Sequence, residues 1–357
     1  MYKVTIDEVI ISIFIWLIAF LNYKSAYRKP HNKKDNYVFF LIIVCVFSTF
    51  AYTTGDFAHY HELYESIYLG APSYDLEEIY CVLLNILPHN YYLWRFVIWG
   101  ASLIFLILTY KRIQSPVRSS CLFFVLILIS GFSNLRNTLG LEIMFFSLTF
   151  FINPIGNKKI SYMLGFLGLL VCIPFHKSMP LYVGISLLSF FVMTRWMYII
   201  SLLSFPFIYV AFKYIASYLL SLDLGGGDFE NSGSHYLEGE NFSVTNLNGY
   251  FSLILCRLPI LLLLYYVISR TLQGVIDNKV VVYFSKYAYW LIYISCVFFN
   301  QPTSSFLSVR FWDASLYSLV FVFPLALYMK KDKIISLGYS LLILSNIYSL
   351  LYSIYKV

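Results

Sequence analysis

Charged residues are scarce in this chain. Only 12% of its 357 residues are Asp, Glu, Lys or Arg, whereas 60% are hydrophobic and the mean hydropathy is +0.73. Soluble domains carry about 25% charged residues, so this composition excludes a water-soluble globular protein. Cysteine is also sparse, and the six cysteines lie in or beside apolar runs without a CxxC pair. Such spacing favours neither a disulfide framework nor a cysteine-ligated metal site.

Several enzyme motifs are missing as well. The sequence has no Walker loop, no GxSxG elbow, no dinucleotide-binding glycine fingerprint and no zinc-ligand spacing, so neither a metal nor a cofactor is expected. The net charge of +7 does not indicate a nucleic-acid partner, because the basic residues lie in short loops between apolar runs. The sequence therefore predicts an integral membrane protein in contact with membrane lipid.

Apolar runs long enough to cross a bilayer fill almost the whole chain. A transmembrane helix needs about 20 mostly apolar residues, and on that basis we predict spans near 6–22, 37–53, 93–110, 119–134, 137–152, 160–175, 178–194, 197–220, 249–268, 283–300, 310–328 and 334–353. The fold class is all-α, with about twelve spans in a single transmembrane domain over residues 1–357, and the shortest runs leave ten or eleven open. The run Ile79–Leu87 is too short to cross and is predicted to be a half-helix within loop 53–92.

The distribution of charge predicts which loops face the cytoplasm. The proposed spans put 16 of the 25 basic residues on one face, which the positive-inside rule assigns to the cytoplasm. The two longest loops on the other face, 53–78 and 221–248, contain eleven carboxylates and no Lys or Arg. We therefore expect both loops to lie outside the cytoplasm.

Four basic residues break this rule, because they lie at or near the outer ends of spans: Arg136, Lys177, Arg257 and Arg310. One interpretation is internal ion pairing, for example of Arg136 with Glu142. The other is a cationic pocket that opens outward, since ionisable groups in a membrane usually face a bundle interior or a cavity. Arginine offers a planar fork of donors that suits phosphate oxygens, so the phosphate of a lipid is the expected ligand.

Lys213 and Lys286, near span ends, are expected to snorkel towards the membrane surface. Arg95, one turn inside the span that starts at 93, is interpreted either as snorkelling in the same way or as contacting a lipid headgroup, because Trp94 and Trp99 flank it.

Two other features point to the same outer face. If residues 56–65 are helical, Asp56, Tyr60 and Tyr64 share one face at i, i+4 and i+8. A carboxylate beside tyrosine rings would suit a sugar, although an interfacial aromatic belt is the alternative. His176, next to Lys177, is interpreted as a general acid or base, a phosphate donor or a core histidine.

These segments resemble a known family. The Gly55-Asp56 pair with its spaced tyrosines, the run Asp75–Tyr80, the turn Leu135–Gly140, the turn Pro174–Ser178 and the late pair Arg310-Phe311 occur in the order and spacing of the EpsG-like family of Wzy-type O-antigen and exopolysaccharide polymerases. The resemblance implies a GT-C-like helical fold in the bacterial inner membrane, with a periplasmic active site.

The resemblance also implies an activity. Such enzymes are glycosyltransferases that move a growing glycan from undecaprenyl diphosphate to the next lipid-linked repeat unit, and a chain-length regulator is a candidate partner. On this basis Arg136 and Arg310, with Lys177 and Arg257, would bind the diphosphate, and Asp56 or His176 would be the base. Two alternatives stay open: a flippase or exporter of lipid-linked oligosaccharide, and an O-antigen ligase.

Overall fold

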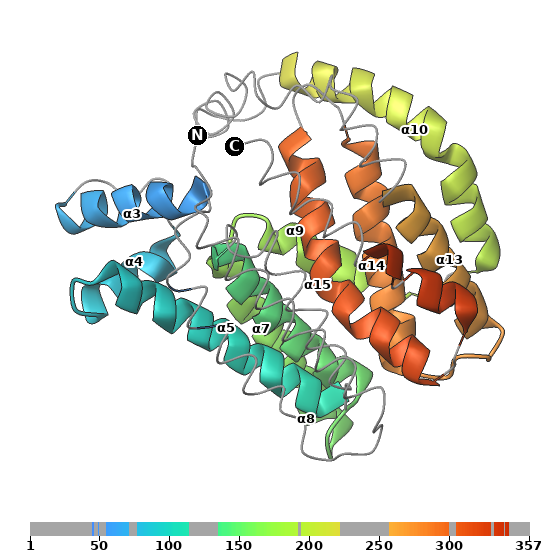
Figure 1. Ribbon diagram of the computed structural model, residues 1–357, viewed down its shortest axis with the longest axis horizontal. Coiled ribbons are helices and arrows are strands. Elements are labelled where there is room, and N and C mark those ends of the chain that lie inside the picture. The colour runs from blue at the N-terminus through green and yellow to red at the C-terminus, as the bar shows by residue number, and fades with distance from the viewer. Residues whose placement is uncertain are drawn as a thin grey trace. The chain divides into compact units, whose positions relative to one another are not determined.

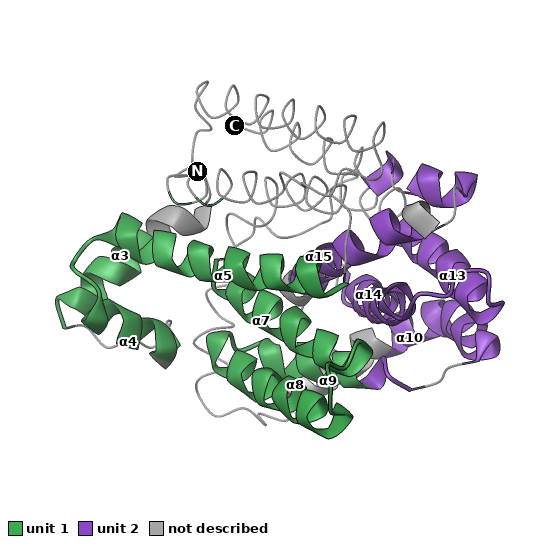
Figure 2. Ribbon diagram, turned by 90° about the horizontal axis from the view of Figure 1, so that it is seen from below, with its two compact units in different colours: residues 1–187, 346–357 green, residues 188–345 purple. Residues whose placement is uncertain are grey.

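A computed structural model describes residues 45, 49, 55–70, 77–113, 135–191, 194–221, 257–299, 305–329, 332–338 and 340–342. Every regular element within these ranges is a helix, which agrees with the predicted all-α class. The chain divides into two compact units, residues 1–187 with 346–357 and residues 188–345, which are coloured separately in Figure 2.

In the first unit, three long helices pack side by side (Figure 1). The helix α7 (Leu135–Ile152) contacts both α5 (Tyr91–Ile113) and α8 (Lys158–Cys172). The remaining elements are α3 (Gly55–Tyr68), α4 (Glu78–Ile86), the 3-10 turn η2 (Ile173–Phe175) and α9 (Met179–Leu188). The element α4 matches the predicted half-helix.

The end of this unit at which α5 and α7 finish carries Lys111, Arg112, Lys158 and Lys159. Arg112 in the last turn of α5 donates to the Thr149 hydroxyl at 2.6 Å and to the Asn153 carbonyl at 2.8 Å. The C-terminal ends of α5 and α7 therefore meet here. The Asn157 side chain caps α8 at the same end by accepting from the Lys159 backbone N–H. These residues belong to loops that the sequence predicts to be cytoplasmic, and that orientation stays a prediction.

The second unit is built on α14 (Lys279–Val297) and α15 (Ser305–Met329), with α13 (Leu258–Leu272) and α10 (Arg195–Ser221) packed against α14 (Figure 1). Ser295 and Ser308 join α14 to α15, because each hydroxyl donates to the other residue's carbonyl at 2.7 Å. Asn278 caps α14 by accepting from two backbone N–H groups. The α14–α15 pair therefore forms the core of this unit.

Length and composition identify five membrane-crossing helices in the described residues: 91–113, 135–152, 158–175, 279–297 and 308–326. The chain is therefore a helical membrane protein, while the count of twelve spans stays a prediction. The described part of the predicted span 178–194 contains α9, which has only ten residues. A helix of that length rises about 15 Å, half of the hydrocarbon thickness. The spans predicted at 6–22 and 119–134, most of 37–53, and loop 221–248 beyond Ser221 lie outside the described residues.

Arg95 and Lys286, both interpreted as snorkelling, are buried instead, while the side chain of Lys213 lies outside the described residues. The Arg95 side chain is fully buried, and it donates to the Thr49 carbonyl at 3.2 Å and to the Tyr91 hydroxyl at 3.3 Å. Lys286 is 8% exposed, and its Nζ donates to the Phe191 carbonyl at 3.4 Å. Both predictions were wrong because hydropathy along the chain does not reveal the internal acceptors that helix packing supplies.

Candidate functional site

The site in the first unit is built around Arg136, in the first turn of α7. Its Nη1 lies 2.6 Å from Oε2 of Glu77, and its Nε donates to the Tyr60 hydroxyl at 3.0 Å. The guanidinium carbon also lies 4.9 Å from the centroid of the Tyr60 ring. The Arg136 and Glu77 side chains are only 13% and 11% exposed. Because a charge so far removed from water needs a partner, this ion pair holds the guanidinium in place.

Glu77 was not among the predicted site residues. The alternative considered for Arg136 was an ion pair with Glu142, and this was wrong: Arg136 pairs with Glu77. Glu142 is buried, and neither of its oxygens has a hydrogen-bond partner within the described part of the chain. One signal could have pointed to Glu77. It lies in an acidic run before α4 whose loop contains no Lys or Arg, so its carboxylates had to find a cation from another outer-face segment.

Tyr80 fixes α4 against this arginine. Its hydroxyl donates to the Arg136 carbonyl at 3.0 Å, and its ring packs edge-on against Trp94 and Phe175, with centroids 6.1 and 6.0 Å away. Burial raises the pKa of the Tyr80 phenol well above its ordinary value, so the group stays neutral and keeps its donor proton. One side chain thus connects α4, α7 and η2.

The turn that holds His176 packs on α7 close to Arg136. A Cβ placed on Gly140 would lie 3.3 Å from Cβ of Phe175 and 2.8 Å from Sδ of Met179, so only glycine lets this turn approach so closely. The two motifs predicted from the sequence, the arginine turn and the phenylalanine–histidine turn, therefore meet in one unit.

His176 has a defined hydrogen bond in this turn. Its Nδ1 accepts from the Ser178 backbone N–H at 3.1 Å. A ring nitrogen that accepts a hydrogen bond carries no proton, so the ring proton lies on Nε2 and that nitrogen is a donor. The half-buried His176 ring is therefore arranged to donate to an oxygen, and Lys177 beside it is exposed.

The tyrosines of α3 lie where the sequence placed them. The helix Gly55–Tyr68 puts Asp56, Tyr60 and Tyr64 at the predicted helical spacing, although the Asp56 side chain lies outside the described residues. Tyr60 and Tyr64 are both buried. Tyr60 contacts Arg136, while Tyr64 packs against Tyr91 and His89. A role for either tyrosine in sugar binding stays a prediction.

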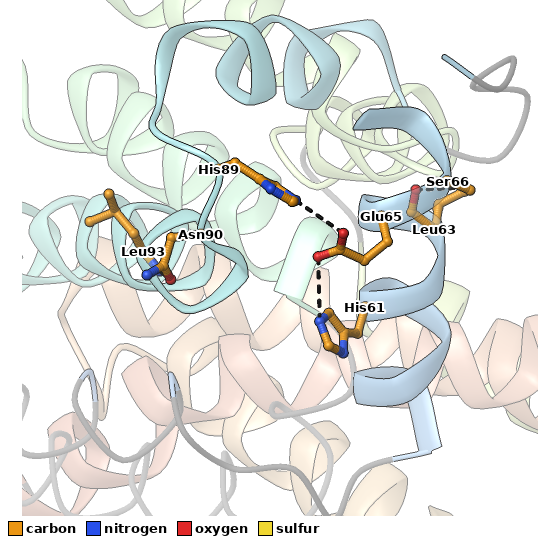
Figure 3. A network of polar contacts seen from close by, with 7 residues as sticks. All are labelled: His61, Leu63, Glu65, Ser66, His89, Asn90 and Leu93. Atoms are coloured by element: carbon orange, nitrogen blue, oxygen red, sulfur yellow. Dashed lines mark hydrogen bonds and ion pairs between the residues drawn. The ribbon is translucent and has the colours of Figure 1, made fainter. Parts of the chain in front are cut away.

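A second polar cluster, which was not predicted from the sequence, lies next to these tyrosines. Figure 3 shows the Glu65 carboxylate between two imidazoles, with Nε2 of His61 at 3.6 Å and Nε2 of His89 at 3.0 Å. His61 stacks on Tyr91 and His89 stacks on Tyr68. These side chains are 36% to 47% exposed, so the cluster faces the surface of the first unit. The i,i+4 spacing of His61 and Glu65 was a local signal for half of this cluster, whereas His89 is 24 residues from Glu65 and had none.

The other two predicted arginines belong to the second unit. Arg257, just before α13, is buried; its Nη1 donates to the Ser308 hydroxyl and to the Ser295 carbonyl at 3.5 Å. Its guanidinium carbon lies 4.9 Å from the Phe299 ring centroid. The half-buried Arg310 lies on α15, two residues after Ser308. Arg257 and the start of α15 are thus brought together.

These features define a polytopic helical membrane protein. It has a largely buried arginine, held by a carboxylate and a tyrosine, at the N-terminal end of one of its helices. A profile of the EpsG family matches residues 35–357, and the chain belongs to that family. No curated protein and no solved structure matches it.

Proposed function

We propose that this chain is a polysaccharide polymerase of the bacterial inner membrane. It would transfer a glycan from undecaprenyl diphosphate to the next lipid-linked repeat unit on the periplasmic face, as in the synthesis of O-antigen or a related surface polysaccharide. The observation that carries the proposal is the Arg136 guanidinium, which Glu77 and Tyr60 hold in the first turn of α7, the helix on which the His176 turn packs. Membership of the EpsG family, a family of Wzy-like polymerases, supports the same activity.

The chemistry of this transfer explains why a fixed arginine is needed. The hydroxyl oxygen of the acceptor sugar attacks the anomeric carbon of the donor, and the bond from that carbon to the diphosphate oxygen breaks. The electron pair leaves with undecaprenyl diphosphate, while the hydroxyl proton passes to a base. Positive groups that are already oriented stabilise the charge that develops on the leaving oxygen. Arg136 would supply such a group.

Glu77 gives Arg136 a partner before a substrate arrives. The carboxylate and a phosphate oxygen are both anionic acceptors for a guanidinium, so the diphosphate would compete with Glu77 or share the guanidinium with it. Glu77 would then be a positioning residue that keeps the arginine charged and oriented inside the protein. His176, with its donor nitrogen Nε2, is proposed to donate to a phosphate oxygen, and the exposed Lys177 to add charge.

Arg257 and Arg310 stay predicted ligands of the diphosphate. Arg257 is held by Ser308 and stacks on aromatic rings, which supports a preformed cationic group in the second unit. The overall GT-C-like fold also stays part of this proposal.

The test of this activity is incubation of the purified protein with lipid-linked repeat unit alone. We expect a ladder of lipid-linked polymers that grows with time, together with release of undecaprenyl diphosphate. A polymer-free reaction in which the repeat unit crosses the bilayer of a proteoliposome would instead indicate an exporter. Transfer only to added lipid A, without polymer, would indicate a ligase.

The base is proposed to be Asp56, because Nδ1 of His176 is occupied and its other nitrogen carries the proton. Asp56 lies one helical turn before Tyr60, which contacts Arg136. General-base catalysis contributes about 100-fold to 10,000-fold, so Asp56→Asn should lower the polymerisation rate by about 100-fold or more without loss of bound lipid-linked donor.

His176→Asn should lower the polymerisation rate by about tenfold, the size expected for one phosphate hydrogen bond. The reverse order of these two losses would assign the base to His176.

A further inference from the structure

A second arginine pocket lies at the end of the second unit where α10 begins and α13 ends. It has a volume of about 200 Å³ and is lined by Arg195, Tyr265, Tyr266, Ser269, Arg270 and Gln273. No carboxylate is among these residues. Arg270 lies 13 residues after Arg257 along α13, which separates the two arginines by about 20 Å of helix rise. The pocket is therefore distinct from the Arg257 cluster.

Each arginine of the pocket is held through one nitrogen only. Nε of Arg195 donates to the Tyr265 hydroxyl at 3.0 Å, and Nε of Arg270 donates to the Tyr266 hydroxyl at 3.0 Å. Within the described part of the chain, the terminal nitrogens of both guanidiniums have no hydrogen-bond acceptor. Two oriented guanidiniums thus keep their forked donors for an anion, and phosphate oxygens match that fork.

The carboxylate of Asp332, beside the pocket, is already engaged. The Tyr266 hydroxyl, which accepts from Arg270, donates to Oδ2 of Asp332 at 2.8 Å. The other oxygen, Oδ1, accepts from the backbone N–H groups of Ile334 and Ile335 at the start of the next helical segment. Burial opposes the charge on Asp332, but these hydrogen bonds and the positive charge of Arg270 outweigh it and lower the pKa of the carboxyl. Asp332 therefore orients Tyr266 and does not close an ion pair with either arginine.

Apolar side chains beside the pocket place it at a membrane boundary. Trp196, next to Arg195, is 70% exposed, and Leu272, two residues after Arg270, is 44% exposed. Tryptophan is enriched at the level of the lipid headgroups. Further along α10, Ile200 and Leu203 are also exposed, as expected of a helix face that meets lipid tails.

We propose that this pocket binds the phosphate of an anionic phospholipid headgroup, with Arg195 and Arg270 as its ligands. A pocket volume of about 200 Å³ can hold a headgroup phosphate between the two guanidiniums. Basic pockets between transmembrane helices are known sites for such headgroups. The site goes beyond the proposed polymerase activity, and the predicted topology puts it on the cytoplasmic side.

The experiment measures lipid retained by the purified full-length protein in detergent, by native mass spectrometry at constant ionic strength. The probes are phosphatidylglycerol and a diacylglycerol with the same acyl chains but no phosphate. Wild type should retain phosphatidylglycerol and release diacylglycerol. Arg195→Gln and Arg270→Gln should each weaken retention about tenfold, and the double variant more, because each removes charge-assisted hydrogen bonds. All variants are compared at equal amounts of protein with the wild-type elution volume.

The matched control is Lys333→Gln, which removes one exposed positive charge beside Asp332 but no residue that lines the pocket. It should change retention less than about twofold. Equal losses in the control and in the arginine variants, or wild-type retention in the double variant, would overturn the proposal. Glycerol phosphate distinguishes the source of the phosphate: it should not displace the lipid, and complete displacement would overturn the assignment to a lipid headgroup in favour of a soluble phosphate.

Discussion

Replacing Arg136 with alanine is expected to lower the rate of polymer formation by about 100-fold or more. Loss of one fixed donor to a developing oxyanion costs about 100-fold to 1,000-fold in known enzymes, and Arg136 carries a full charge as well as its hydrogen bonds. The measurement is the initial rate at which purified protein extends lipid-linked repeat units. Arg136→Lys keeps the charge but loses the planar fork, so it should recover only part of the rate.

A loss of activity in Arg136→Ala could also come from unfolding. That change leaves Glu77 only 11% exposed and without its cation, and removing one partner of a buried ion pair costs about 3–5 kcal/mol, less where water reaches the pair. The double variant Arg136→Ala with Glu77→Gln removes both charges and should restore the yield of folded protein. We expect it to stay inactive, because the guanidinium is still missing.

Arg112→Gln serves as the matched control for this series. Arg112 is also a hydrogen-bonded arginine at a helix end of the first unit, but at the end opposite Arg136. Its replacement should leave the polymerisation rate per folded molecule within about twofold of wild type. Polymer formation at the wild-type rate by the Arg136→Ala, Glu77→Gln double variant would show that Arg136 has only a structural role.

The sequence predicts the positions of the helices well and the pairings between their side chains poorly. Hydropathy and helical spacing located α7, α14 and the α3 helix that carries Tyr60, because both depend on neighbours within one or two turns. The order of the motifs predicted that the Arg136 turn and the Phe175–His176 turn belong together, and they meet through Tyr80 and Gly140.

The pairings themselves were not predictable from local patterns. Glu77 and Arg136 are 59 residues apart, and the nearer carboxylate on the same helix, Glu142, looked like an equally good partner. Only the tertiary structure decides between them: α4 packs on η2 and is tied to α7 by the Tyr80 hydroxyl, which brings Glu77 to the first turn of α7, while Glu142 is buried inside the unit. For the same reason the contact of His89 with Glu65 had no signal in the sequence, whereas His61 and Glu65 share the i,i+4 spacing of one helix face.

Replacing Gly168 with valine is expected to lower stability through a steric clash between two helices. A Cβ at this position of α8 would lie 2.9 Å from Cβ of Ser147 on α7 and closer still to the Ser147 hydroxyl oxygen. Small residues let transmembrane helices approach closely, so a larger side chain must push α8 away from α7. Overpacking costs about 3 kcal/mol in a well-packed contact, which predicts a fall in Tm of roughly 5 °C in detergent.

Gly184→Val is the control for this prediction. Gly184 is also a helical glycine of the first unit, on α9, but nothing lies within 4 Å of a Cβ built there. Both substitutions carry the same change in helix propensity and in unfolded-chain entropy, so the difference between their Tm values isolates the contact with Ser147.

A second variant tests the cause of the lower Tm. Ser147→Gly in the Gly168→Val background should recover part of the lost Tm, because it removes the atoms that the valine meets. Equal Tm values for Gly168→Val and Gly184→Val would mean that α7 and α8 are not packed as closely as the structure has them. The support that α8 gives to α7, which carries Arg136, would then have to come from other contacts.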